Sequence, residues 1–480
     1  MKLVDLLRSV DCRYDSIYDD REIKDLCFDS RKVKKGSLFV AQSGLSCDGH
    51  DFLDEAAGSG VTAIVCMRLP SLPWEGVAYV VTPDSSEALG IIASNFYGNP
   101  SSSLKLVGVT GTNGKTTVAT LAYDLCRSMG YKAGLLSTVC NRVDEKRLET
   151  THTTPDVLTI NRLLREMADA GCRYCFMEVS SHAVVQKRIC GLRFAGGVFT
   201  NITHDHLDYH KTFKNYIHAK KAFFDHLPPE AFALTNADDK NGALMLQNTL
   251  ARKYTCSIRT LGDFKGDAIE KHWDSMLMRF DGEEVWMKFT GDFNVYNLTA
   301  VYAVASLLNF PKDAVLRAMS GLIPVAGRFQ TSISPEGVVA VVDYAHTPDA
   351  LENVLRTVDT LRSGGARIIT VVGAGGDRDK TKRPEMAEIA CRYSNIVIFT
   401  SDNPRFEDPE SILDDMEKGA YKGKYMRETD RKKAIEDAVR MAVKGDVVLI
   451  AGKGHENYQE IKGVRTHFDD WEIIKGLFKE

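Results

Sequence analysis

The chain has 480 residues, which is too long for a single hydrophobic core, so we expect two or three domains. Hydrophobic residues make up 44% and charged residues 26%, values typical of a globular protein with ample apolar surface to bury. The formal net charge of −4 gives no general electrostatic reason to expect nucleic acid or membrane as a partner, so any anionic ligand must be held by local positive groups.

The cysteines indicate a reducing compartment. There are eleven, an odd number, scattered without disulfide or zinc-ribbon spacing, and no apolar signal stretch follows the first methionine. Cys172 and Cys175 stand where a buried strand is expected to begin, so we interpret them as buried thiols rather than redox or metal groups. No apolar run approaches the ~20 residues needed to span a bilayer. We therefore expect a cytoplasmic protein without a membrane span.

The first part of the chain alternates short apolar runs with polar segments. Between residues 36 and 83 the runs are SLFVA, VTAIVC and VAYVV, and SSEALGIIASNFYG then shows a helical pattern. The segment NPSSS at residues 99–103 has the composition of a linker. We therefore place a first α/β domain at residues 1–103.

A longer alternation of strand-like and helical segments begins at Leu104. The strand-like runs are KLVGVT, YKAGLLST, CFMEVS, GGVFTNI and FALTNA, and amphipathic stretches such as TTVATLAYDLCRSMG separate them. This alternation predicts a parallel sheet flanked by helices. We place this central domain at residues 104–327.

The pattern breaks near residues 327–335, where a second alternating series begins. Its apolar runs are GVVAVVDYA, ARIITVVGAGG, NIVIFTSD and DVVLIAGKG. Thr347 and Pro348 have the chemistry of an N-cap and a first helical position before DALENVLRTVDTL. We therefore expect a third, Rossmann-like α/β domain at residues 328–480.

The stretch GVTGTNGKTT, at residues 108–117, predicts a phosphate-binding loop. Its glycines let backbone N–H groups face phosphate oxygens, its lysine neutralises the β and γ phosphates, and the next hydroxyl binds magnesium. Val109 stands where the strict pattern has its first glycine, so this is a variant loop. The alternative is an ordinary glycine-rich turn between a strand and a helix, but the lysine and two threonines favour ATP. The predicted ATP contacts are Gly111, Thr112, Asn113, Gly114, Lys115, Thr116 and Thr117.

Acidic and imidazole side chains follow the next two predicted strands. Glu178 ends the strand CRYCFMEV at the sheet edge where ligands bind, and a hard cation bridging phosphates requires such an oxygen ligand. A surface glutamate at a strand end is about equally probable for this segment alone. The following segment THDHLDYH could suggest zinc, but no matching Cys or His cluster stands elsewhere, so a metal–polyphosphate role for one histidine is more economical. Composition alone predicts that Lys220 and Lys221, in NYIHAKKAFFDHL, are solvated.

Taken together and in order, the motifs resemble those of the Mur ligases of bacterial peptidoglycan synthesis. The matching segments are DSR, DGHDF, TGTNGKTT, THTTPD, EVSSHAVVQKR, NITHDHLDYH, HAKKAFF, FNVYNLTA, AGRF, DYAHTPDAL, GGDRDKTKRP, DNPR and AGKGHE. They span nearly the whole chain, and their order and number carry the resemblance. One departure is Gln330 after AGRF, where an acidic residue is usual, which puts a local contact in doubt.

The resemblance implies an ATP-dependent, amide-forming ligase with an N-terminal UDP-sugar-binding domain, a central P-loop ATPase-type domain and a C-terminal amino-acid-binding domain. Phosphorylation by ATP makes a carboxylate electrophilic, and an amine then displaces phosphate from the acyl phosphate. The implied partners are UDP-N-acetylmuramoyl-L-alanyl-D-glutamate, whose D-glutamate side chain is activated, and meso-diaminopimelate. A monomer whose domains close around these ligands is expected.

The resemblance also implies roles for individual residues. Glu178 resembles a magnesium ligand and His206 its imidazole partner, while Thr116 completes the first metal site. Lys220 resembles the lysine that reacts with carbon dioxide, and the resulting carbamate would bind a second magnesium. The implied catalytic group is thus Lys115, Glu178, His206 and Lys220. Further nucleotide contacts are Asn294, Asn297, Arg328, Asp343 and His346, and implied contacts to the UDP-sugar peptide are Ser30, Thr153, Thr154, Ser180, Gln186 and Arg188.

The segment FTSDNPRFED resembles the family pattern for meso-diaminopimelate, whose far end carries a second carboxylate. A guanidinium binds a carboxylate bidentately, and lysine as a substrate lacks that carboxylate. Taken alone, DNPR is better explained by an Asn-Pro turn with a surface arginine. Glu456 is expected to bind the distal ammonium. The implied pocket comprises Arg378, Asp402, Asn403, Pro404, Arg405, Gly452 and Glu456.

Three alternatives remain open at this point. The same reaction could use L-lysine or another diamino acid, and a folylpolyglutamate-type ligase would share the phosphate loop and the activation chemistry. A nucleotide-binding protein that has lost catalysis is the non-enzyme alternative. The presence of the four catalytic candidates together weighs against such a loss.

Overall fold

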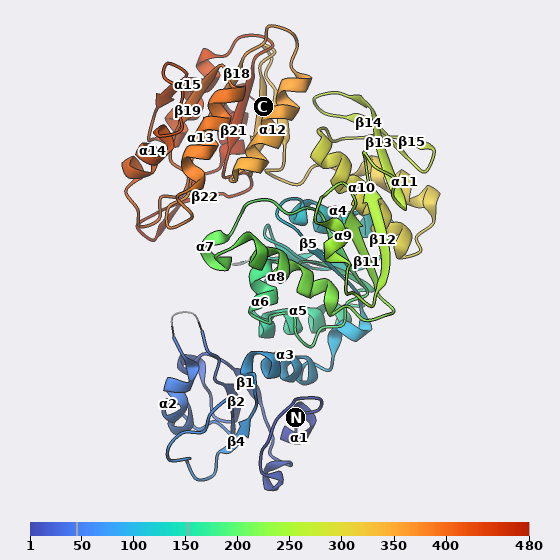
Figure 1. Cartoon of the computed structure of the whole chain (residues 1–480), viewed down its shortest axis with the longest axis vertical. Coiled ribbons are helices and arrows are strands. Elements are labelled where there is room, and N and C mark those ends of the chain that lie inside the picture. The colour runs from blue at the N-terminus through green and yellow to red at the C-terminus, as the bar shows by residue number, and fades with distance from the viewer. Residues whose placement is uncertain (45–46, 151–152, 480) are drawn as a thin grey trace.

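The computed structural model describes residues 1–44, 47–150 and 153–479, which form three main sheets (Figure 1). The part built from the first hundred residues, the central part and the C-terminal part follow one another along the long axis of the molecule (Figure 1). In the described part of the chain, no helix is both long and apolar enough to cross a membrane.

The N-terminal sheet is parallel throughout, in the order β1-β2-β3-β4. Every residue of β2 and β3 is buried, which agrees with their short continuous apolar runs. The strands are β1 (Asp25–Cys27), β2 (Ser37–Val40), β3 (Ala63–Cys66) and β4 (Ala78–Val81). The helices are α1 (Leu3–Leu6), α2 (Leu53–Gly58) and α3 (Ser85–Phe96), with short 3₁₀ turns at Ser16–Tyr18, Ser30–Lys32, Gly49–Phe52 and Pro100–Ser103.

The central sheet is parallel in its middle and antiparallel at both edges. Its parallel part extends from β6 to β13, which confirms the predicted parallel sheet, whereas β7 and β8 at one edge and β14 and β15 at the other pair antiparallel. In order across the sheet the strands are β15 (Glu283–Met287), β14 (Met276–Phe280), β13 (Phe264–Lys271), β12 (Arg252–Ser257), β11 (Phe232–Asn236), β10 (Gly196–Phe199), β5 (Lys105–Thr110), β9 (Tyr174–Glu178), β6 (Ala133–Leu136), β7 (Asn141–Val143) and β8 (Lys146–Leu148).

Helices cover both faces of this sheet, because side chains of the buried strands alternate between them. Val107 and Val109 of β5 pack with α4, α10 and α11, whereas Leu106 packs on the other face with α5 and α8. A Cβ at Gly108 would lie 2.6 Å from Cζ of Phe223, so the glycine allows α8 to approach the strand. The helices are α4 (Lys115–Ser128), α5 (Val157–Asp169), α6 (Ser181–Val185), α7 (Leu207–His210), α8 (Phe213–Asp225), α9 (Gly242–Met245), α10 (Asp292–Leu307) and α11 (Lys312–Gly321).

The C-terminal sheet has the order β16-β17-β21-β18-β19-β20 and is parallel except for the pair β16-β17. Helices α12 to α14 pack on one face and α15 and α16 on the other. The strands are β16 (Gln330–Ile333), β17 (Val339–Asp343), β18 (Ile368–Val372), β19 (Ile396–Phe399), β20 (Tyr425–Arg427) and β21 (Val447–Ala451), with a separate hairpin of β22 (Tyr458–Ile461) and β23 (Val464–His467). The helices are α12 (Pro348–Leu361), α13 (Lys382–Tyr393), α14 (Pro409–Glu417), α15 (Arg431–Met441) and α16 (Asp470–Phe478).

The connections between the sheets locate the predicted domain limits. Residues 97–104 join α3 to β5, and residues 322–329 join α11 to β16. The limits placed at 103/104 and 327/328 fall within these two connections, and we propose them as the domain boundaries.

A buried ion pair ties the first residues of α15 and α16 together. Arg431 Nη2 lies 2.7 Å from Asp470 Oδ2, and neither side chain is exposed. The guanidinium also donates to the carbonyl oxygens of Ser401 (3.4 Å) and Ala451 (3.1 Å), which follow β19 and end β21. The pair therefore supports two loops at the carboxyl edge of the C-terminal sheet.

Replacing Arg431 with methionine should lower the free energy of unfolding of the C-terminal domain by about 3 kcal/mol, because it leaves the Asp470 carboxylate buried and unpaired. Urea unfolding followed by circular dichroism measures this loss. The double replacement Arg431→Met/Asp470→Leu should recover part of it, and Arg440→Ala, which removes an exposed pair with Asp437, should cost under about 1 kcal/mol. If the single and double variants are destabilised equally, the ion pair stabilises the domain through packing and not through its charges.

Candidate functional site

A large cavity, of about 1590 Å³, lies where the carboxyl edge of the central sheet faces the C-terminal domain. Ligand pockets typically measure about 300–1,000 Å³, so this cavity has room for more than one ligand. Most of the predicted site residues line it. They are Thr112, Asn113, Gly114, Lys115, Thr116, Thr117, Thr153, Thr154, Glu178, Ser180, Arg188, His206, Lys220, Asn297, Arg328, Asp343, His346, Arg378, Asp402, Asn403, Arg405, Gly452 and Glu456.

A few predicted residues do not line this cavity. Ser30 lies in the N-terminal domain, at the start of the 3₁₀ turn Ser30–Lys32. Among the described residues, Gly111, Gln186, Asn294 and Pro404 lie near the cavity in sequence but are also absent from its wall. Gly111 and Asn294 still contact residues that line it, through a carbonyl oxygen and a side-chain oxygen respectively.

The phosphate loop joins β5 to α4 in the strand–turn–helix arrangement that the sequence predicted. Gly114 has φ +89°, and a Cβ there would lie 2.5 Å from Oδ1 of Asn297, so the position requires glycine. The Lys115 ammonium donates to the carbonyl oxygens of Gly111 (2.9 Å) and Thr112 (2.8 Å). Burial lowers the pKa of Lys115, and the nearby Glu178 and Asp205 carboxylates oppose this shift. The loop residues from Thr112 to Thr117, with this lysine among them, line the cavity.

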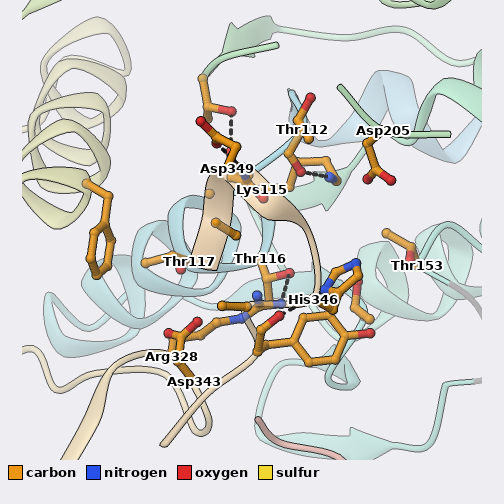
Figure 2. Close-up of a pocket in the computed structure, with 18 of the residues that line it drawn as sticks. Thr112, Lys115, Thr116, Thr117, Thr153, Asp205, Arg328, Asp343, His346 and Asp349 are labelled. Atoms are coloured by element: carbon orange, nitrogen blue, oxygen red, sulfur yellow. Dashed lines mark hydrogen bonds between the residues drawn. The ribbon is translucent and has the colours of Figure 1, made fainter. Parts of the chain in front are cut away.

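Residues of the C-terminal domain face the loop across the cavity (Figure 2). Arg328 Nη2 donates to Thr116 Oγ1 at 3.2 Å, and its guanidinium lies over the Tyr344 ring at 4.5 Å. Asp343 accepts a hydrogen bond from the backbone N–H of Phe329 (2.7 Å). Burial raises the pKa of Asp343 to about 6, although Arg328 opposes the shift. These contacts place an arginine and a carboxylate opposite the start of α4.

A second contact between the two domains was not predicted. The side-chain amide of Asn113 donates to Asp349 Oδ2 at 3.0 Å, and Asp349 lies in the first turn of α12 (Figure 2). Asp349 belongs to the segment DYAHTPDAL, from which only the histidine and the first aspartate were selected. The sequence contained the residue, but its pairing with the phosphate loop depends on how the domains are arranged.

Glu178 ends β9 beside β5 and is 1% exposed. Its carboxylate accepts hydrogen bonds from the Thr138 backbone N–H (2.7 Å) and hydroxyl (3.1 Å). Thr138 follows β6, and no motif in the sequence indicated this role for it. The two hydrogen bonds fix the carboxylate at the edge of the cavity.

His206 has a left-handed backbone, with φ +54°, and its ring Nε2 lies 3.3 Å from Asp205 Oδ2. Its ring is also 4.9 Å from that of His182. Burial lowers the pKa of His206 to about 3, although Asp205 opposes this shift. The imidazole is therefore neutral near pH 7, which is the form that binds metal ions.

Lys220 and Lys221 are both buried, so the expectation from composition that they are solvated is wrong. Lys220 is 1% exposed, its Nζ donates to the Gly111 carbonyl oxygen at 2.7 Å and lies 4.7 Å from the Tyr216 ring centre. Burial and the nearby Lys115 ammonium lower the pKa of Lys220 well below its ordinary value. Lys221 instead pairs with Asp225 at 2.7 Å on α8. The two adjacent lysines thus lie in different environments.

Within the described residues, no group of three or more His, Cys, Asp or Glu side chains could by itself hold a metal ion. Magnesium binds through one or two carboxylates together with substrate phosphates and water. The fixed Glu178 carboxylate, the neutral His206 ring and the Thr116 hydroxyl border the cavity beside the phosphate loop, and this donor set fits a magnesium ion shared with phosphates.

The segments DNPR and GKGHE form one wall of the cavity, beyond β19 and β21. Arg405 has φ +54°, and its Nη1 donates to the Gly376 carbonyl oxygen at 2.6 Å. Asn403 Nδ2 donates to Glu456 Oε2 at 2.7 Å. Gly452 has φ +119°, and a Cβ there would lie 2.6 Å from Asp402 Oδ2. Arg405 is half-buried and lines the cavity, whereas an ordinary Asn-Pro turn would leave its arginine on the open surface.

Four of the predicted contacts to the UDP-sugar peptide, Thr154, Ser180, Gln186 and Arg188, form a connected hydrogen-bond network. Thr154 Oγ1 donates to the carbonyl oxygen of Glu178 (2.9 Å) and to Ser180 Oγ (3.2 Å). Arg188 donates to the Thr154 carbonyl oxygen (2.7 Å) and to Gln186 Oε1 (2.9 Å from Nε). The first two residues of THTTPD lie outside the described residues.

Gln330, the departure noted in the sequence, has a local role. Its Oε1 accepts a hydrogen bond from the backbone N–H of Gly327 at 3.0 Å and so closes the turn that carries Arg328. A neutral amide can make this contact as well as a carboxylate can.

Comparison with known proteins gives three matches to family models along the chain. The Mur ligase middle domain matches residues 109–305, the model described as Mur ligase, glutamate ligase domain matches residues 327–454, and the model described as Mur ligase family, catalytic domain matches residues 22–97.

Full-length relatives and solved structures give the same result. The UDP-N-acetylmuramoyl-L-alanyl-D-glutamate–2,6-diaminopimelate ligase of Bacteroides fragilis is 55% identical over 481 residues, covering 100% of this chain and 99% of the relative. A solved structure of a ligase with the same name is 31% identical, with a TM-score of 0.71, and the match covers 100% of this chain and 99% of that one. A MurF ligase from Thermotoga maritima in complex with ADP is 21% identical, with a TM-score of 0.64 and coverage of 96% and 98%, and shares the fold.

Proposed function

The chain belongs to the Mur ligase family, and we infer that it is the ATP-dependent ligase that joins meso-2,6-diaminopimelate to the D-glutamate side chain of UDP-N-acetylmuramoyl-L-alanyl-D-glutamate in peptidoglycan synthesis. The observation that carries this function is the shared cavity, where the phosphate loop faces a pocket that contains Arg405 and Glu456. Phosphoryl transfer from ATP and capture of the acyl phosphate by the amino acid can therefore occur at one site. The products are the tripeptide precursor, ADP and phosphate.

The activation step needs groups that stabilise negative charge on the transferred phosphoryl group. The D-glutamate carboxylate attacks the γ-phosphorus and gives an acyl phosphate, with ADP as the leaving group. Lys115 and the N-terminal end of α4 bind the phosphates, and Arg328 approaches the same point from the C-terminal domain. Magnesium, when bound by Glu178, His206 and Thr116, supplies further charge neutralisation. In the second step, the amine attacks the acyl carbon and phosphate leaves.

We propose that Lys220 carries a carbamate. Only an unprotonated amine can attack carbon dioxide, and burial of Lys220 favours the neutral amine. The reaction releases one proton and turns a potential cation into an anion. That anion would stand beside the phosphate loop, where a second magnesium requires an oxygen ligand.

The amino-acid pocket offers complementary charges for the far end of diaminopimelate. We propose that Arg405 and Arg378 bind its distal carboxylate and that Glu456 binds its distal ammonium, with Asp402, Asn403 and Gly452 shaping the pocket. The side chain of lysine would leave the arginines without a carboxylate partner. Specificity for the diamino diacid follows from this difference.

The UDP-sugar peptide would extend from the reaction centre toward the N-terminal domain. Thr154, Ser180 and Arg188 are hydrogen-bonded to one another around the end of β9, and we propose that they position the peptide part of the precursor. Ser30 would contact the nucleotide end from the N-terminal domain. We further propose that the protein acts as a monomer and that it lies in the cytoplasm. The cytoplasmic location agrees with free thiols at all eleven cysteines.

Phosphate release from ATP tests the proposed function. The purified protein should release phosphate when it is given the UDP-muramoyl dipeptide and meso-diaminopimelate, and either ligand alone should give no turnover. A panel with LL-diaminopimelate and L-lysine should rank the meso diacid first. A preference for lysine would support the alternative substrate, and no release with any member of the panel would refute the ligase.

A further inference from the structure

Lys453 lies directly behind the wall of the amino-acid pocket. It is 0% exposed and follows β21 between Gly452 and Gly454, both of which have positive φ values. It does not itself line the cavity, whereas Gly452 and Glu456 do. Any effect of Lys453 on a ligand must therefore pass through its neighbours.

The Lys453 ammonium has three N–H donors, and three oxygen atoms of neighbouring residues accept hydrogen bonds from it. It donates to Asn403 Oδ1 at 3.2 Å, to Glu456 Oε2 at 3.5 Å and to the Tyr458 carbonyl oxygen. Two of these acceptors belong to the proposed diaminopimelate pocket. Because all three N–H donors of this buried ammonium are engaged, the side chains that accept from it are held in fixed orientations.

The contact with Asn403 determines which way its amide group points. The Oδ1 atom accepts from Lys453 and also from the backbone N–H of Glu460 at 2.9 Å. Both partners are donors, so the amide oxygen must face them and the NH₂ group must face Glu456. Asn403 Nδ2 accordingly donates to Glu456 Oε2 at 2.7 Å.

The contact with Glu456 provides a counter-charge. Burial and the nearby Asp402 carboxylate raise the pKa of Glu456, and Lys453 opposes both effects. A carboxylate that is to bind an ammonium group must be ionised. Tyr344 holds the other oxygen of Glu456, at 3.4 Å from its hydroxyl.

We propose that Lys453 is a positioning residue for the amino-acid substrate: it orients the Asn403 amide and keeps the Glu456 carboxylate aligned to receive the distal ammonium group. The inference rests on the proposed function, because it takes diaminopimelate as the ligand of this pocket. It adds a residue that does not touch the substrate but sets the geometry of two residues that do.

Steady-state kinetics of Lys453→Met test the proposal, because methionine keeps the length of the stem and removes the charge and the donors. The KM for meso-diaminopimelate should rise at least tenfold, while the KM values for ATP and the UDP-muramoyl dipeptide change less than twofold. Lys221→Met is the matched control, since it removes another buried lysine that pairs with a carboxylate outside the cavity wall. It should leave the KM for diaminopimelate within twofold of wild type.

A double-mutant cycle with Glu456→Gln separates positioning from general destabilisation. If Lys453 acts through Glu456, adding Lys453→Met to Glu456→Gln should raise the KM for diaminopimelate less than threefold. The same tenfold increase in both backgrounds would overturn the proposal, as would equal increases in the KM values of all three substrates. The double variant lacks the unpaired buried carboxylate, so it serves as the test if Lys453→Met alone does not fold.

The wild-type protein distinguishes failure of this inference from failure of the proposed function. If wild type does not ligate diaminopimelate, the function itself is wrong. If wild type is active and Lys453→Met has an unchanged KM for diaminopimelate, only the role of Lys453 is wrong.

Discussion

Lys220→Ala should abolish ligation, with a loss in kcat of at least about 10⁴-fold, equivalent to about 5.4 kcal/mol of transition-state stabilisation. The lysine lies fully inside the protein, beside the phosphate loop and 2.7 Å from the Gly111 carbonyl oxygen. As a carbamate it would supply the negative oxygen ligand for a metal ion at that point. Alanine supplies no charge and leaves an empty space of the same shape.

That space provides a chemical test of the carbamate itself. Formate, acetate or excess bicarbonate should enter it and place an oxygen anion where the carbamate stood, which partly restores phosphate release in Lys220→Ala. Formate and acetate, which cannot carbamylate a lysine, should not accelerate the wild-type protein. A variant inactivated by misfolding would not respond to any of them.

Lys221→Ala is the control for Lys220→Ala, since the two residues are adjacent on α8 and both are buried. Lys221 pairs with Asp225, so its loss should reduce stability modestly and leave kcat within about twofold of wild type. Full activity of Lys220→Ala would remove the carbamate from the mechanism. Inactivity without rescue by any anion would limit Lys220 to a structural role.

The parallel centre of the central sheet could be predicted from sequence because its strands are continuous apolar runs. KLVGVT and CFMEVS became β5 and β9, which are almost entirely buried. Strands in the outer parts of the sheet gave no such signal. β8 consists of Lys146–Leu148, and β13 (Phe264–Lys271) carries charged residues along its length, so neither shows the apolar face by which a strand is recognised.

The site residues show a similar division. The phosphate loop could be predicted from its own short sequence, because glycine spacing, a lysine and a hydroxyl are local requirements. The burial of Lys220 could not, because a lysine in an amphipathic helix is usually solvated and only the packing of α8 against the sheet encloses it. Lys453 and Arg431 are further cases, where charged side chains support the pocket from behind.

Arg405→Ala should raise the KM for meso-diaminopimelate about 10²- to 10³-fold, or about 3–4 kcal/mol, because a buried bidentate contact to a carboxylate is lost. The backbone and its hydrogen bonds hold the Arg405 side chain in one orientation. Arg405 has a left-handed backbone, which a non-glycine residue adopts only where its surroundings impose it. Its N–H donates to the Glu460 carbonyl oxygen at 3.0 Å, which binds it to β22, and its guanidinium donates to Gly376.

Comparing two substrates isolates the contact that the arginine makes. Lysine shares the rest of the diaminopimelate skeleton but lacks the distal carboxylate, so Arg405→Ala should lose most of the wild-type preference for the diacid while the weak activity with lysine stays nearly unchanged. Arg405→Lys should fall between the two, since it keeps the charge but not the planar fork. Arg440→Ala, an exposed arginine on α15 of the same domain, is the matched control and should behave as wild type. An equal loss with both amino acids would mean that Arg405 binds the end of the substrate that they share, and the distal carboxylate would then need another partner.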